Sequence, residues 1–119
     1  MVDRMSWLPR LERLVGDIVI VEVVEAALRD GPKSMRVGLF AVGDGGVVFY
    51  RKRLLGDELL AYRASDIVDV NVGPHELSRL LGDEAQEIAF GFADGTTWNV
   101  GPLRADEVRR LIPALPLQA

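Results

Sequence analysis

The chain contains 119 residues, of which 49% are hydrophobic and 27% are charged, and its formal net charge is −4. This length and balance predict a single soluble globular domain, and the acidic excess argues against general nucleic-acid binding. The absence of cysteine excludes disulfides, thiolate zinc sites and cysteine nucleophiles. No apolar run approaches the ~18 residues of a membrane-spanning helix, and the charged N-terminal residues do not fit a signal peptide, so we expect a cytoplasmic protein.

The first 16 residues carry an amphipathic pattern. Apolar residues recur at helical spacing after Ser6, which is suited to cap a helix, and they are Trp7, Leu8, Leu11 and Leu14. A basic helix with a tryptophan can lie on a membrane surface, but the small net charge favours packing on its own domain or on a second subunit. We therefore predict an N-terminal helix over residues 1–16, with these four residues as interface residues, and a globular domain over 17–119.

The first apolar run of the domain is DIVIVEVVEAAL, and its β-branched residues predict a strand. Glu22 and Glu25 are separated by an odd number of positions, so a regular strand would place them on opposite faces. A bulge or sharp bend between them would turn both carboxylates to solvent. The pattern predicts a long, bent first strand that contributes to two sheets.

Two hairpin turns then predict the strand register. An Asp44-Gly45 turn pairs Val42 with Val47, Phe40 with Phe49 and Arg36 with Arg53. A closing hairpin around Gly95 pairs large residues on one face, namely Phe92 with Thr96, Phe90 with Trp98 and Ile88 with Val100.

Helical patterns occupy two later positions. A short helical insert follows Gly73-Pro74, and a terminal amphipathic helix covers roughly residues 105–112. Asp106 and Glu107 lie in the first turn of the terminal helix, where their negative charges interact favourably with the helix dipole. Pro113 is expected to limit the length of this helix.

The segment VGDGGVVFYRKRLLGDELLAYRASDIVDVNV contains a turn, an apolar strand ending in aromatics, a basic stretch and a Ser-Asp-Ile sequence. With the tail ADGTTWNVGPLRADEVRRLI, it resembles the bacterial pleckstrin-homology-like (PH-like) domains and, more distantly, the GRAM domains. One departure is that family members often carry Thr-Asn/Asp-x-Arg-Leu where this chain has residues 42–46. The resemblance implies a mainly β barrel or roll of about seven antiparallel strands in two orthogonal sheets, capped by the C-terminal helix.

Six basic residues are expected near one end of this fold, because antiparallel strands return there: Arg29, Lys33, Arg36, Arg51, Lys52 and Arg53. We call this set the basic rim. In pleckstrin-homology domains the corresponding rim binds anionic phospholipid headgroups, so the resemblance implies an alternative function in anionic-lipid or phosphate-ligand binding. The other interpretation, favoured by the net charge, is a solvated rim neutralised by Asp30, Asp57 and Glu58.

No constellation of residues indicates an enzyme. The single histidine, His75, lies in a polar turn without an oriented partner, and the GDGG sequence lacks the residues of a phosphate-binding loop. No cofactor or metal is expected. We predict a non-enzymatic protein-interaction or assembly module, with self-association through exposed sheet edges as its expected mode.

Overall fold

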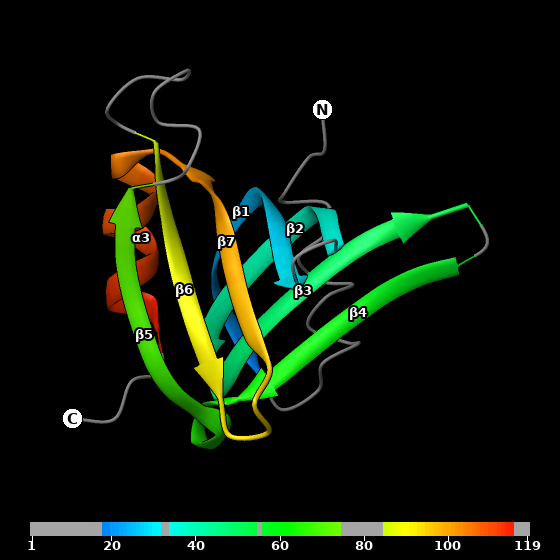
Figure 1. Cartoon of the computed structure of the whole chain (residues 1–119), viewed down its shortest axis with the longest axis horizontal. Helices are drawn as coiled ribbons and strands as arrows, with labels where there is room; N and C mark the ends of the chain where they lie inside the picture. Colours follow the sequence, from blue (N-terminus) through cyan, green and yellow to red (C-terminus); the bar gives the residue numbers. More distant parts are fainter. Residues whose placement is uncertain (1–17, 32–33, 55, 75–84, 116–119) are drawn as a thin grey trace.

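The computed structural model describes residues 18–31, 34–54, 56–74 and 85–115. Their elements, in chain order, are β1 (Val19–Gly31), β2 (Ser34–Asp44), β3 (Gly46–Arg53), β4 (Gly56–Arg63), the 3-10 turn η1 (Ala64–Asp66), β5 (Ile67–Pro74), β6 (Gln86–Phe92), β7 (Thr97–Leu103) and helix α3 (Ala105–Ala114). The strands form one antiparallel sheet in the order β4-β3-β2-β1-β7-β6-β5 (Figure 1). The prediction of antiparallel strands followed by a C-terminal helix is confirmed for these residues.

The prediction of two orthogonal sheets was wrong, because β1 joins all the strands into a single sheet. One edge of β1 pairs with β2 along most of its length, and the other edge pairs with β7. The β1–β7 ladder is short and consists of Ala27↔Gly101, Leu28↔Val100 and Arg29↔Asn99. Pairing on both edges of β1 makes one continuous sheet, and the sheet bends enough to bring β4 and β6 into contact.

The β1 bulge lies at a different place from the one predicted. The register with β2 shifts between Ile20 and Glu22 and again between Leu28 and Gly31, and not between Glu22 and Glu25. Glu22 and Glu25 therefore keep opposite orientations, opposite Val42 and Leu39 respectively. Gly43 stands opposite Ile20 at this bulge, and a methyl group there would overlap the carbonyl oxygen of Val19.

Both predicted hairpin registers are confirmed where the structure records pairing. Val42↔Val47 and Phe40↔Phe49 face each other across the first turn, and Ile88↔Val100 and Phe90↔Trp98 do so across the second. The Phe92 amide donates to the Thr96 carbonyl at 2.9 Å. Gly95 has φ +90°, a conformation that favours glycine, as the turn required. The Arg36–Arg53 pairing lies beyond the recorded ladder.

The main core lies on the face of the sheet that packs against α3, which we call the inner face. Its fully buried side chains come from five strands and the helix, and they include Phe40, Phe49, Phe90, Trp98 and Leu111. Alternate residues of each strand point to this face, so the apolar period-two pattern of the hairpins supplies most of the core.

An aromatic cluster closes the curled sheet between strands that are not neighbours. Tyr62 of β4 stacks on Phe92 of β6 with ring centroids 3.7 Å apart, and its edge meets Trp98 of β7 at 5.3 Å. The Tyr62 hydroxyl also donates to Asp94 in the β6–β7 turn at 2.9 Å. β4 and β6 are far apart in the strand order, so these contacts record how strongly the sheet bends.

Helix α3 covers the inner face and contacts β1, β2 and β6. It begins after Arg104, whose amide donates to the Glu107 carboxylate at 2.9 Å, and it continues through Pro113 to Ala114. The predicted limit at Pro113 was therefore slightly early. Arg110 forms an ion pair with Glu22 of β1 at 3.2 Å, which ties the helix to the sheet.

The opposite face of the sheet, which we call the outer face, is also buried over part of β1, β2 and β3. A second apolar cluster lies there and consists of Ile18, Ile20, Val23, Leu39, Ala41, Val48 and Tyr50, with Leu59 of β4 packed against it. Each of the seven is 8% exposed or less. We call these seven residues the outer cluster.

Two predicted helices, over residues 1–16 and after Gly73-Pro74, lie largely outside the described residues. The part of the insert that is described, Gly73 and Pro74, belongs to the end of β5. Among the elements described, β3 and β4 project as a long hairpin on the side of the sheet away from α3 (Figure 1).

The aromatic closure can be tested by truncating Tyr62. We expect Tyr62→Ala to lower the free energy of unfolding by about 2–3 kcal/mol, because it removes the ring that joins β4 to β6 and β7. Tyr62→Phe is the matched control, since it keeps the stacking and loses the hydroxyl bond to Asp94. Urea denaturation would measure both, and equal losses for the two variants would contradict a closure held by ring stacking.

Candidate functional site

The structure places the described members of the basic rim on two faces of the sheet. Arg36 lies opposite Leu28, and Arg51 lies opposite Glu58, so both face the inner side. Arg29 and Lys52 occupy alternate positions on β1 and β3 and face the outer side. Lys33 and the side chain of Arg53 lie outside the described residues. The four described members of the basic rim therefore do not share one face of the sheet.

The two inner arginines share one carboxylate. Glu58 Oε1 accepts from Arg36 Nε at 2.9 Å and from Arg51 Nε at 2.8 Å. All three side chains are between 19% and 29% exposed, so water screens these ion pairs less than at a fully open surface. The like charges of Arg36 and Arg51 are compensated by Glu58, which the cross-strand register places directly opposite Arg51.

A second carboxylate completes this network. Asp30 Oδ2 lies 2.6 Å from Arg36 Nη1, and the same nitrogen donates to Ser34 Oγ at 2.9 Å. A hydrogen bond from Ser34 and the charge of Arg36 lower the pKa of Asp30. Asp30 and Glu58 in turn raise the pKa of Arg36. The Asp30–Arg36–Glu58–Arg51 set thus contains two cations and two anions.

The outer side of the same hairpin carries a different site. Tyr50 donates its hydroxyl to Asp57 Oδ2 at 2.6 Å, and Asp57 is paired across the strands with Lys52. Beside Tyr50 is a partly open hollow of about 230 Å³, lined by Glu25, Val37, Gly38, Leu39, Tyr50, Arg51 and Lys52. Its lining combines apolar side chains with charged residues of both signs, a combination suited to holding an amphipathic group.

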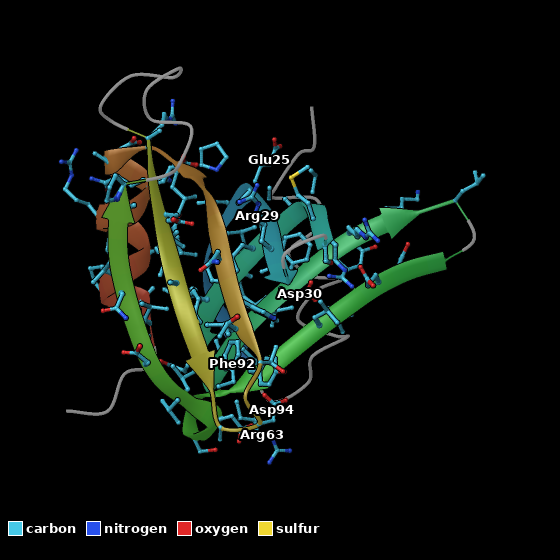
Figure 2. All side chains as sticks on the ribbon, viewed as in Figure 1. Glu25, Arg29, Asp30, Arg63, Phe92 and Asp94 are labelled. Carbon is cyan, nitrogen blue, oxygen red and sulfur yellow. The ribbon has the colours of Figure 1, made fainter. Side chains whose placement is uncertain are left out.

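Figure 2 labels six side chains that lie at different positions along the fold. Glu25 and Arg29 are labelled toward one end of the fold and Asp30 between the ends, whereas Phe92, Asp94 and Arg63 are labelled toward the other end. At this second end Asp94 Oδ1 accepts from the Thr96 amide at 2.8 Å. That bond and the hydrogen bond from the Tyr62 hydroxyl lower the pKa of Asp94. The carboxylate thus stabilises the β6–β7 turn and holds Tyr62 in the aromatic cluster.

No group of three or more His, Cys, Asp or Glu side chains within the described ranges could hold a metal ion. His75 and the predicted interface residues Trp7, Leu8, Leu11 and Leu14 lie outside these ranges. No described helix is long and apolar enough to cross a membrane.

Sequence reasoning named Glu58 among the acids that neutralise the basic rim, but it missed the position of Glu58 between two arginines and the whole outer cluster. The signal for Glu58 was its position across the β3–β4 turn from Arg51, but that pairing requires the turn length to be known. The signal for the outer cluster was the run FAVGDGGVVFY, in which apolar residues occupy consecutive positions. Consecutive apolar residues indicate a strand that is buried on both faces.

Comparison with protein-family models, with curated proteins and with solved structures found no match to this chain. The resemblance to PH-like domains therefore stays a prediction.

The pH dependence of stability should show the contribution of Asp30. Its pKa is lowered in the folded state, so its stabilisation is complete above the ordinary aspartate value of about 3.9 and is lost as the pH falls through the folded value. We expect Asp30→Asn to lower the free energy of unfolding at pH 7 by less than about 1 kcal/mol, because the ion pair is near the surface. The difference from the natural chain should shrink as the pH falls below the ordinary aspartate value.

Urea denaturation at pH 7 and in acid would measure this difference, with the exposed Asp44→Asn as a charge-matched control. A loss caused by Asp30→Asn that is as large in acid as at neutral pH would show that the ion pair with Arg36 is not its source.

Release of the inner arginines should create an anion site. We expect little of the natural chain to co-sediment with phosphatidylserine vesicles at about 0.15 M salt, because Arg36 and Arg51 are already compensated. Glu58→Gln removes the shared carboxylate and should raise the bound fraction several-fold. Glu87→Gln, on β6, is the matched control. Strong binding by the natural chain that Arg36→Glu abolishes would contradict this expectation.

Proposed function

We propose that this chain is a non-enzymatic assembly module that pairs with a second copy of itself along the free edge of β4. The proposal rests on one observation. β4 is the terminal strand of the described sheet, and its pairing with β3 runs without a register shift from Gly46↔Arg63 to Arg53↔Gly56. A long, regular terminal strand presents a template for another strand.

The other terminal strand, β5, is a poorer template. Its register with β6 shifts between Ile67 and Asp69, and it ends at Pro74, which has no amide hydrogen. Bulges and prolines are the devices by which natural sheets protect their edges from pairing. The two ends of the sheet therefore differ, and the difference favours β4.

The side chains of β4 are compatible with a second copy. Glu58 and Asp57 would repel their counterparts, but both are engaged within the sheet, Glu58 by two arginines and Asp57 by the Tyr50 hydroxyl. The stretch between Glu58 and Arg63, Leu59–Tyr62, is uncharged. Antiparallel pairing of two β4 strands about a two-fold axis would make one continuous sheet and a closed dimer.

We propose a PH-like fold for the same chain, supported by seven antiparallel strands and one C-terminal helix. Members of that family serve as binding or assembly modules, which agrees with the proposed function. Anionic-lipid binding remains the alternative, and the paired state of Arg36 and Arg51 makes it the weaker of the two.

Self-association through β4 can be tested with Ala61→Lys. Ala61 is exposed near the middle of the uncharged stretch, so in a two-fold pair each new lysine would lie close to its own copy. We expect the natural chain to show a mass of twice 13.1 kDa by size-exclusion chromatography with light scattering. The variant should return to 13.1 kDa with unchanged circular dichroism.

Val68→Lys is the matched control, because it places the same charge at an exposed position on the opposite terminal strand. It should leave the dimer intact. A natural chain that stays monomeric up to about 100 µM, or a dimer that only Val68→Lys dissociates, would refute pairing through β4.

A further inference from the structure

The outer cluster is buried without a partner layer in the described part of the chain. Its seven residues come from β1, β2, β3 and the residue that precedes β1, so every one belongs to the sheet or its immediate start. Val48 and Ala41 are 0% and 1% exposed, and α3 packs on the opposite face. Side chains in one row of a sheet do not bury one another to this extent, so a second layer must cover them.

The buried part of the outer face ends abruptly on β2. Leu39 is 3% exposed, whereas Val37, the next residue on the same face, is 66% exposed. The covered part therefore extends from Leu39 toward the β2–β3 turn, a length of about 14 Å along the strand. The hollow beside Tyr50 lies at the boundary, where Val37 and Leu39 are both among its lining residues.

Among the segments outside the described residues, 1–17 has the length and the position to supply this layer. It leads directly into Ile18, which is itself a member of the outer cluster. Residues 75–84 are attached to β5 and β6, at the far end of the strand order from β3, and residues 116–119 follow Leu115 of the inner core. The other gaps contain one or two residues.

We propose that the outer face of β1–β3 is a docking surface for the chain's own N-terminal segment, seated through Trp7, Leu8, Leu11 and Leu14. The apolar stripe of this segment spans residues 7–15, which as a helix would be about 13 Å long and would match the covered length. This inference is independent of pairing through β4, which uses the edge of the sheet and not its face.

The natural absence of cysteine makes a cross-linking experiment direct. Ala41→Cys on the outer face is combined in turn with Leu8→Cys, Leu11→Cys or Leu14→Cys, and the full-length chain is oxidised with copper phenanthroline. A disulfide requires Cβ atoms about 4 Å apart, so only a docked segment will form one efficiently. We expect at least one pair to give an intramolecular disulfide, detected by mass spectrometry of the monomer.

The control pairs each stripe cysteine with Ala93→Cys, which is exposed in the β6–β7 turn and should not react with it. Intermolecular disulfides alone would assign the cover to a second copy and overturn the proposal. No disulfide in any of the three Ala41→Cys pairs would also overturn it.

A second measurement needs no cysteine. Leu11→Glu places a charge in the apolar stripe and should release the segment, so the fluorescence of the hydrophobic dye ANS should rise several-fold as the outer cluster becomes exposed. Arg10→Glu changes the charge at the adjacent position outside the stripe and should leave the fluorescence unchanged. Equal fluorescence for Leu11→Glu and Arg10→Glu would show that the stripe does not cover the cluster.

Discussion

The pairing of β1 on both of its edges is the constraint on which the rest of the structure depends. β1 joins the β2–β4 strands to the β5–β7 strands, and its side chains are buried on both faces over part of its length. Val23 and Val24 are consecutive and both buried, one in each cluster. A residue pair of this kind leaves β1 little freedom to shift its register, because a slip by one position would exchange the two faces. The ion pair of Glu22 with Arg110 and the bulge opposite Gly43 are adjustments around this fixed strand.

Much of this fold could be predicted from local sequence, and the parts that could not be predicted depend on long-range geometry. Hairpin registers follow from turn residues and alternating large side chains, so Phe40↔Phe49 and Phe90↔Trp98 were accessible from a few neighbouring positions. The union of the strands into one sheet depends on three residue pairs between β1 and β7, and no local pattern encodes them. The bulge was placed wrongly because two glutamates suggested a shared exposure to solvent. In the folded chain one of them meets a helix that lies far along the sequence.

The candidate site likewise has features that follow from local sequence and features that depend on long-range geometry. The sequence predicts that arginines and acids gather near one hairpin end, but it does not predict which face each occupies. Strand alternation separates Arg29 and Lys52 from Arg36 and Arg51, and the register then places Glu58 between the last two. In three dimensions, Arg36 and Arg51 belong to a compensated network with Asp30 and Glu58. Asp30 and Glu58 therefore neutralise the arginines beside them, and the net charge of −4 does not indicate the local charge at this part of the surface.

The short ladder between β1 and β7 also constrains the order in which the chain can fold. Ala27 pairs with Gly101 of β7. The edge of β1 that faces β7 can therefore pair only after β7 has been synthesised. The β1–β4 hairpins need only local contacts and form early, whereas closure across β1 has a high contact order and is slow. During that interval Ala27, Leu28 and Arg29 of β1 lack their partners on β7, and an unpaired strand edge is the kind of edge that recruits other chains. The stage of synthesis before β7 appears is thus the stage at which this protein most needs protection from aggregation.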